Sequence, residues 1–408
     1  MALTIERVEI LLLIAAVVAM LARRLRVPYS IGLVVAGISL ALLPFSPQIQ
    51  LTKELLFTAF LPPLIFEAAF HLQWRELRRD LPIILTLATI GVLLSAAATA
   101  SGMHYFARWQ WTGALVFGVL IAATDPVSVI AIFKEAGAQG RIRLLVEAES
   151  LFNDCTAAVL FSIALAFAAG QNVSAPGVTW MLFATVLGAT VCGAAVAALV
   201  LLMMGRTDDH LIEITFTTVA AYGSFLLAEH FHLSGVLATL TTGLVIGSTG
   251  HLGAISDRGR EAVETFWEYA AFIANSLVFL LIGMHEARED FRHVLVPALV
   301  AIAVVALGRA LAIYPLSLVF ARSALRIEKK HQHILFWGGL RGALALALAL
   351  GLPPEMPRRE EIISVAFAVV AFSIFVQGLT ITPLLRRTGE LRSQQPGRKE
   401  GPLSVPPA

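Results

Sequence analysis

Long runs of apolar residues recur along almost the whole chain and are separated by short polar loops. About 20 apolar residues cross the hydrocarbon core of a bilayer as a helix, so each run predicts a transmembrane helix. The thirteen runs, delimited to within a few residues, are 8–22, 29–44, 55–72, 81–106, 111–133, 146–169, 176–204, 211–230, 233–249, 265–284, 294–320, 333–351 and 362–385. The pattern predicts an all-α polytopic membrane protein of about thirteen transmembrane helices.

Two of these runs carry helix-breaking sequence in their interiors. Run 111–133 contains Thr124-Asp125-Pro126, and run 333–351 contains Trp337-Gly338-Gly339-Leu340-Arg341-Gly342. Pro126 removes an interior hydrogen bond but suits the first position of a new helix, with Asp125 or Thr124 as its cap. The two runs lie an odd number of segments apart, so they would cross the membrane in opposite directions. Interrupted helices in oppositely oriented halves point to a transport site at the interface of inverted repeats.

The distribution of basic residues predicts the orientation. Lys and Arg are about three times as frequent in one set of alternating loops as in the other, which places the N-terminus outside and the C-terminus in the cytoplasm. The first run has no small-residue cleavage pattern before Arg23, so we expect a retained helix in the plasma (inner) membrane. Residues 1–385 would form one membrane domain, and the polar residues 386–408 a disordered cytoplasmic tail.

Composition excludes several other classes of protein. The chain has 408 residues, of which 58% are hydrophobic and 14% charged, and it is too apolar for a soluble globule. The net charge of +2 has no basic stripe for nucleic acid. The glycines at 338–342 lack the Lys-Ser/Thr ending of a phosphate-binding loop, so no nucleotide is expected. Two cysteines inside apolar runs form no zinc site, and no cofactor is implied.

Ionisable residues at membrane depth are costly, so each is a hypothesis about function. Two of the 30 Lys and Arg residues, Arg309 and Arg341, lie inside apolar runs. From the expected orientation and a rise of about 1.5 Å per residue, four acidic groups converge with them toward one layer. These acidic groups are Glu67, Asp125, Glu149 and Asp154.

The motif Glu149-Ser150-Leu151-Phe152-Asn153-Asp154 forms two adjacent polar stripes on one side of a helix. Glu147, seven residues before Asp154, would continue toward the cytoplasm and line an aqueous funnel. We assign the exchanging role to Asp154 because it has no obvious basic partner. Glu149 and Arg341 are the more plausible structural ion pair.

Structural explanations of the same residues stay open at this point. Asp154 and Asp125 would be inert if each were paired with Arg309 or Arg341, and Arg309 would be either a static partner of Asp125 or a gate. Glu67 lies near a helix end and would reach water if its side chain extended outward. The hydroxyls of Ser150 and Thr124 would be uninformative if they only bonded back to their own helices.

A buried carboxylate can hold either a proton or a cation, and this competition suggests an exchange mechanism. Burial disfavours the charged form of a carboxylate, whereas a bound cation favours it, so a proton and a cation compete for the same oxygens. Carboxylate, hydroxyl and carbonyl oxygens suit a small hard cation. If only loaded states reorient, this competition yields obligate exchange. We expect Na⁺ for H⁺, with Li⁺ or K⁺ as variants.

Four ordered motifs resemble the NhaP/NHE branch of the cation:proton antiporters. They are Leu61-Pro62-Pro63-Leu64-Ile65-Phe66-Glu67-Ala68-Ala69-Phe70, Ala123-Thr124-Asp125-Pro126, Glu149-Ser150-Leu151-Phe152-Asn153-Asp154 and Gly338-Gly339-Leu340-Arg341-Gly342-Ala343, within a resemblance from Val8 to about Leu385. It implies thirteen helices with six-helix inverted repeats, interleaved dimerisation and core bundles, a homodimer and an elevator-like movement of the core.

The same resemblance implies a set of site residues. The cation would bind Asp154, Asp125, Ser150, Glu67 and the backbone of Thr124, with Asn153 beside it and Glu149 paired to Arg341. An Asn-Asp pair at 153–154 implies electroneutral one-for-one exchange. Cys155 departs from the small Gly or Ala usual after this pair.

Two functions from other classes compete with the antiporter. A cation channel would use the same acidic layer, but it would require a repeated filter segment that the sequence lacks. An intramembrane aspartyl hydrolase would let Asp125 and Asp154 share a proton, but no Gly-x-Gly-Asp-like partner motif is present. The sequence therefore favours a transporter, not an enzyme.

Overall fold

A computed structural model describes residues 5–25, 28–43, 51–125, 130, 133, 140–170, 175–249, 255–287, 289 and 291–390 of the chain. Every predicted apolar run contains helix in this part of the chain. Seven helical segments are long and apolar enough to cross a membrane, and five apolar helices are shorter. The all-α class is confirmed, whereas the number of membrane crossings and the inverted repeats stay predictions.

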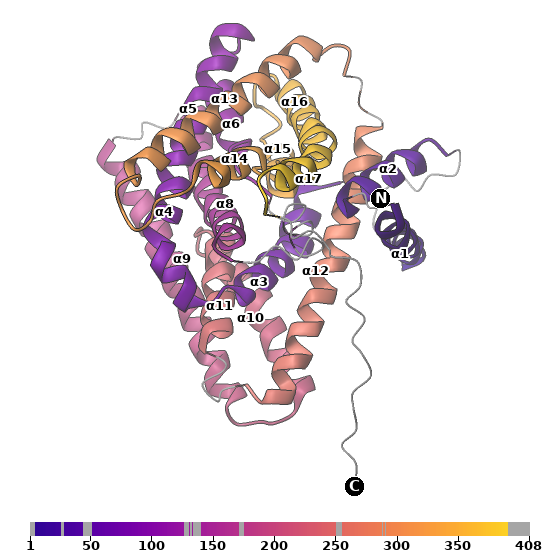
Figure 1. Ribbon diagram of the computed structural model, residues 1–408, viewed down its shortest axis with the longest axis vertical. Helices are drawn as coiled ribbons and strands as arrows, with labels where there is room; N and C mark the ends of the chain where they lie inside the picture. Colours follow the sequence, from indigo (N-terminus) through magenta and orange to yellow (C-terminus); the bar gives the residue numbers. More distant parts are fainter. Residues whose placement is uncertain are drawn as a thin grey trace, which may run out of the picture.

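The helices follow one another in the order drawn in Figure 1. Their bounds are α1 Ile5–Leu25, α2 Tyr29–Ala41, η1 Leu55–Phe60, α3 Leu61–His71, α4 Trp74–Thr86, η2 Leu87–Gly91, α5 Val92–Phe106, α6 Trp111–Leu120, α8 Arg141–Ala168, α9 Ala175–Met204, α10 His210–His230, α11 Gly235–Thr249, α12 Asp257–Glu286, α13 Leu295–Val319, α14 Lys329–Trp337, α15 Ala343–Leu350, α16 Arg359–Phe372, η4 Ser373–Gln377 and α17 Gly378–Arg387.

The helices pack into two groups that share few contacts. Helices α1, α2, α3 and α10 pack against α12, and α9 and α11 join them through α10 and α3; we call this group the α12 bundle. Helices α4, α5, α6, α14 and α15 pack against α8, and α13, α16 and α17 join them through α5, α15 and α14; we call this group the α8 bundle. In Figure 1, α8 is seen nearly end-on at the centre, with most of the α8 bundle above it, α3, α10 and α11 below it, and α12 rising along the right-hand side.

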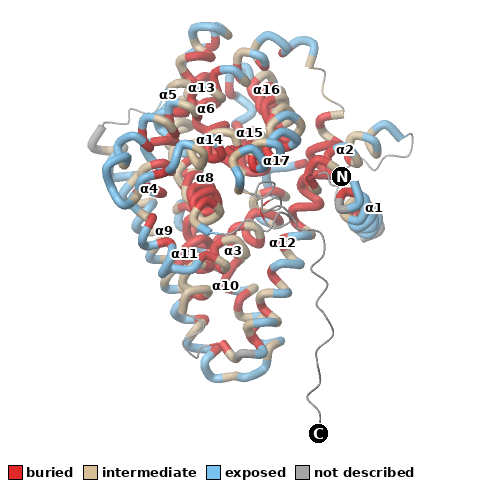
Figure 2. The backbone as a smooth tube through the Cα atoms, in the orientation of Figure 1, coloured by how far each residue is buried: buried red, intermediate tan, exposed pale blue. Residues whose placement is uncertain are grey.

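Large apolar side chains cover much of the outer surface. Leu199 and Leu202 on α9, Val219 on α10 and Leu299 on α13 are each more than half exposed. Figure 2 shows these outer helices with alternating exposed and buried stretches, whereas the centre of the molecule is buried. Apolar side chains on the outside of a helical protein with saturated backbone hydrogen bonds are what a bilayer requires. The surface therefore supports the prediction of a membrane protein.

The two predicted interruptions meet each other. Helix α6 ends at Leu120, and the chain is no longer helical up to Asp125; α14 ends at Trp337, and α15 begins only at Ala343. The two non-helical stretches cross as a single antiparallel bridge, in which the Asp125 N–H donates to the Leu340 carbonyl at 2.7 Å. Pro126 lies outside the described residues. The bridge fixes one break against the other within the α8 bundle.

Helix α3 lies unusually close to α11 because two glycines face it. A methyl group on Gly243 would lie 2.9 Å from the carbonyl oxygen of Phe66, and one on Gly247 would lie 2.9 Å from the Cα of Phe70. Any side chain at either position would push the helices apart. This pair of glycines serves close helix packing, and it holds α3, and with it Glu67, against the interior.

Candidate cation-binding site

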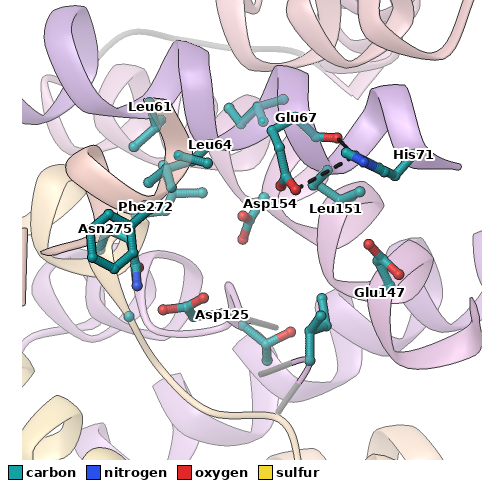
Figure 3. A pocket seen from close by; sticks show the side chains of 18 of the residues that line it. Leu61, Leu64, Glu67, His71, Asp125, Glu147, Leu151, Asp154, Phe272 and Asn275 are labelled. Carbon is teal, nitrogen blue, oxygen red and sulfur yellow. Dashed lines mark hydrogen bonds and ion pairs between the residues drawn. The ribbon is translucent and has the colours of Figure 1, made fainter. Parts of the chain in front are cut away.

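A cavity of about 500 Å³ lies between the two bundles. Five carboxylate side chains line it, together with two basic groups and an apolar wall. The carboxylates are Glu67 on α3, Asp125 in the first break, Glu147 and Asp154 on α8, and Glu268 on α12; the basic residues are His71 and Arg143. Figure 3 shows Asp154, Glu67 and Asp125 around the same space. Glu147 therefore lies where a funnel residue was expected.

Asp154 faces this cavity with one oxygen unpaired. It is half-buried, and its Oδ1 is shielded from solvent without a hydrogen-bond partner among the residues that the structure describes. A carboxylate oxygen kept from water without a donor is costly unless something else occupies that position. The structure does not bear out the alternative of a static salt bridge to Arg309 or Arg341, because Arg309 binds another carboxylate and Arg341 binds backbone carbonyls.

Glu149 is paired, but with a different arginine from the one expected. The Arg309 guanidinium on α13 donates to Glu149 through Nη1 at 2.7 Å and Nη2 at 2.9 Å, and both side chains are almost fully buried. The prediction of a Glu149–Arg341 pair is therefore wrong. Of the two alternatives left open for Arg309, a static partner of Asp125 or a gate, the first is not what the structure shows, because Arg309 binds Glu149. Gly339 leaves room for the Arg309 guanidinium, because a methyl there would lie 2.6 Å from Nε.

Arg341 stabilises the broken helix instead of the carboxylate. Its Nη1 lies 3.5 Å from the carbonyl oxygen of Ala122 and 3.4 Å from that of Ala123, just beyond the C-terminal end of α6. Its backbone N–H donates to the Ser373 hydroxyl at 2.8 Å. The last carbonyls of a helix lack intrahelical donors, and a cation nearby complements their partial negative charge. Arg341 thus fixes the end of α6 from inside the second break.

Thr124, Ser150 and Asn153 form one saturated network. The Thr124 N–H donates to Asn153 Oδ1 at 3.1 Å, which fixes the amide orientation, since a backbone N–H can only donate. Asn153 Nδ2 then donates to Thr124 Oγ1 at 2.5 Å and Glu149 Oε1 at 3.1 Å. Ser150 Oγ donates its one proton to the Thr124 carbonyl at 3.0 Å, so the 2.7 Å contact between the two hydroxyls is donated by Thr124.

The network decides one question that the sequence left open. The hydroxyls of Ser150 and Thr124 bond to each other across two segments, so the alternative that each bonds only to its own helix is wrong. Thr124 lines the cavity, whereas Ser150 reaches it through Thr124. The network holds the non-helical backbone at the break against α8.

Glu67 turns toward the cavity, where Figure 3 draws it beside Asp154. The Nδ1 of His71, one helical turn later, lies 2.9 Å from the Glu67 carbonyl oxygen and 3.5 Å from its Oε1. The Glu67 side chain is about one-fifth exposed, so the alternative of a side chain extended into bulk water is not what the structure shows.

The sequence pattern did not indicate several residues that line the cavity. They are His71, Arg143, Glu268, Phe272 and Asn275. The four-residue spacing of Glu67 and His71 is a signal that the sequence contains, because such pairs share one helix face. Asn275 carries no charge, and a search restricted to ionisable groups at membrane depth does not find it.

The carboxylates surround a space rather than a preformed metal centre. Within the described residues, no three His, Cys, Asp or Glu side chains converge closely enough to hold a metal ion. The oxygen-rich, open arrangement suits a weakly held, partly hydrated alkali cation better than a resident transition metal. The chemistry that this site offers is reversible binding of a cation or a proton.

Comparison with known proteins agrees with this geometry. The family model described as "Sodium/hydrogen exchanger, transmembrane" matches residues 11–387. The low-affinity Na⁺/H⁺ antiporter NhaS1 of Synechocystis is 38% identical over 92% of this chain and 72% of that protein. The Na⁺/H⁺ antiporter NhaP of Pseudomonas aeruginosa is 38% identical over 82% of this chain and 81% of its own.

A solved structure has a similar fold. The sodium proton antiporter MjNhaP1 of Methanocaldococcus jannaschii superimposes with a TM-score of 0.76 over 96% of this chain and 99% of its own, at 21% sequence identity.

Two crossing interruptions beside an Asp154 oxygen without a partner among the described residues are typical of a membrane transporter, and the family model and relatives that match are transporters, not enzymes. The chain belongs to the sodium/hydrogen exchanger family. The resemblance noted from the four motifs is thereby confirmed, and the aspartyl hydrolase is excluded.

Proposed function

We propose that this protein exchanges Na⁺ for H⁺ across the plasma membrane, with both ions competing for Asp154. The observation that carries the proposal is the Asp154 Oδ1, which has no hydrogen-bond partner in the described part of the chain and belongs to a carboxylate that lines the cavity. Its neighbours Asp125, Glu67 and Thr124 supply further hard oxygens, and Ser150 holds Thr124 in place. Relatives named as Na⁺/H⁺ antiporters support sodium, with Li⁺ or K⁺ as alternative cargo.

Electroneutral exchange follows from the chemistry of the Asn153–Asp154 pair. Asn153 is neutral and its amide is fully used in hydrogen bonds, so only one of the two adjacent residues titrates. One carboxylate binds either one proton or one monovalent cation. Each half-cycle then carries the same charge through the membrane, and exchange is one-for-one.

Alternating access would come from movement of the α8 bundle against the α12 bundle. Asp154, Asp125 and Thr124 belong to the former, whereas Glu67 belongs to the latter, and the two groups share few contacts. We propose an elevator-like movement of the α8 bundle, with the α12 bundle forming a homodimer. Residues 1–385 act as one transport domain, with the C-terminus in the cytoplasm.

The test uses proteoliposomes that contain a pH-sensitive dye and are challenged with Na⁺, Li⁺ or K⁺. We expect proton flux that depends on the cation and is unaffected by an imposed membrane potential. Asp154→Asn abolishes the flux, because the amide can neither release a proton nor supply a carboxylate. Glu264→Gln is the matched control, since Glu264 is an exposed partner of Arg260 on α12.

The outcomes separate the remaining functions. Conductance without coupling to protons favours a cation channel, and full flux in Asp154→Asn removes Asp154 from the mechanism. Flux that depends on membrane potential refutes the electroneutral stoichiometry alone.

A further inference from the structure

Asn275 lies in the wall of the cavity that faces the first break. It belongs to α12, so it is carried by the bundle opposite Asp125 and Asp154. The residue is only 7% exposed and lines the cavity with Phe272. Figure 3 draws its amide pointing toward Asp125, with the Phe272 ring next to it.

The Asn275 amide has no hydrogen bond to any residue in the described part of the chain. Asn153 offers a direct contrast, because both its donor hydrogens and its oxygen have protein partners. A primary amide kept from bulk water without partners is costly, and it is tolerated where a water or a ligand completes its bonds. In Figure 3 the Asn275 side chain points into the cavity.

An amide can interact with this site in two states: when the carboxylates are charged and no cation is bound, and when a cation is bound. Its Oδ1 is a hard oxygen of the kind that coordinates alkali and alkaline-earth cations. Its Nδ2 donates to a carboxylate, and Asp125 is the carboxylate toward which it points. One side chain can therefore contact the ion and orient Asp125 together.

Resting on the exchange function proposed above, we propose that Asn275 is a further cation-contacting residue that completes the site from the α12 bundle. Its oxygen adds a ligand that does not travel with Asp154. When the α8 bundle moves, the cation leaves this oxygen behind, so Asn275 strengthens binding on one side of the membrane only.

The test measures exchange in proteoliposomes at alkaline pH with varied Na⁺. Asn275→Leu keeps a similar volume but removes the oxygen, and we expect the KM for Na⁺ to rise roughly five- to tenfold, the scale of one lost polar ligand. The maximal rate changes less than about twofold, because the exchanging carboxylate is intact. Asn275→Gln retains both the amide oxygen and the amide donor, one bond further out, and keeps the KM nearer to that of the wild type.

A second readout does not depend on transport. Na⁺ that binds the folded protein raises its thermal stability to an extent set by its affinity, so the Na⁺-induced shift in Tm should shrink in Asn275→Leu and persist in Asn275→Gln. Thr265→Val is the control, because Thr265 lies on the same helix α12, is exposed, donates to the Glu261 carbonyl and does not line the cavity. Its Na⁺-induced shift stays at the wild-type value.

The results separate this inference from the exchange function. An unchanged KM in Asn275→Leu, or a lower maximal rate with unchanged KM in both variants, overturns the role of Asn275 while leaving exchange intact. Absence of flux and of Na⁺-induced stabilisation in the wild type overturns the exchange function itself. If Asn275→Leu does not fold, Asn275→Ser withdraws the oxygen by one bond, and the same rise in KM is expected.

Discussion

Helix α8 carries two carboxylates five residues apart that have opposite surroundings. Glu149 is held by two hydrogen bonds from Arg309 and one from Asn153, and the group is almost fully buried. Asp154 lines the cavity, and its Oδ1 has no hydrogen-bond partner within the described ranges. The same chemical group is thus fixed at position 149 of the helix and available at position 154.

The roles of the two carboxylates therefore depend on their partners rather than on their depth in the membrane. A buried carboxylate that already accepts two hydrogen bonds from an arginine is costly to disturb and has no free capacity for a second cation. A carboxylate oxygen that lacks a partner and touches a cavity can accept one. The arginine count alone does not reveal this, because two arginines are near and Arg309 is the one that binds a carboxylate, whereas Arg341 binds carbonyls.

The largest loss of stability is expected when Glu149 loses its arginine partner. Arg309→Met leaves Glu149 buried without its cation, and removal of one partner from such a pair costs about 3–5 kcal/mol. We expect a large fall in the Tm of the purified protein in detergent. Asp154→Asn should leave the Tm unchanged or raise it, because it removes a charge that has no paired cation.

The double variant Glu149→Gln with Arg309→Met tests whether Glu149 and Arg309 stabilise the protein as a pair. It removes both charges, and the amide introduced by Glu149→Gln can still accept the Asn153 hydrogen bond, so most of the lost stability should return. If the double variant is no more stable than Arg309→Met alone, the two residues do not act as a pair.

The sequence predicted the elements better than the partners. Apolar runs and breaker residues indicate where helices lie and stop, since those signals are local to each segment. The pairing of Glu149 depends on where α13 lies relative to α8, and residues 149 and 309 are too far apart in the chain for spacing to choose between Arg309 and Arg341. Asn275 was missed because a neutral amide in an apolar run carries little signal.

A smaller effect, on the cavity around Asp154 and Asp125, is expected for Gly342→Ala. A methyl group there would lie 2.6 Å from the Asp125 Cγ, so the Asp125 side chain has to move. Overpacking of this kind typically costs about 1–3 kcal/mol, which reduces exchange through a displaced Asp125 while the protein stays folded. Exchange in proteoliposomes and the Tm are measured together.

Gly113→Ala provides the control for this substitution. Gly113 lies on α6, in the same interrupted segment as Asp125, and an added methyl would meet only the Ile362 side chain at 3.6 Å, an ordinary contact. Exchange should be retained. Equal loss in both variants would mean that the segment tolerates no added methyl anywhere, and that Asp125 is not the reason.

The smallest effect is expected for a paired carboxylate that is itself 15% exposed and whose lysine partner is 42% exposed. Glu390, just after α17, accepts from Lys330 at 2.8 Å and His331 at 3.0 Å. Partial burial acts to raise the pKa of Glu390, but the hydrogen bonds from Lys330 and His331 outweigh it and hold that pKa below its ordinary value of 4.5. A depressed pKa in the folded state adds stability above the unfolded pKa, and this is lost as the pH falls through the folded value.

Glu390→Gln should therefore lower the Tm slightly at neutral pH and not at all once the pH is well below 4.5, where the wild-type carboxyl is protonated as well. A pair with an exposed member, such as Lys330, is also screened by salt, whereas pairs with both members buried are screened much less. High ionic strength should erase the effect of Glu390→Gln and leave that of Arg309→Met in place. The prediction is contradicted if Glu390→Gln lowers the Tm as much as Arg309→Met does and high salt does not reduce this loss. The two pairs would then not differ in their access to water.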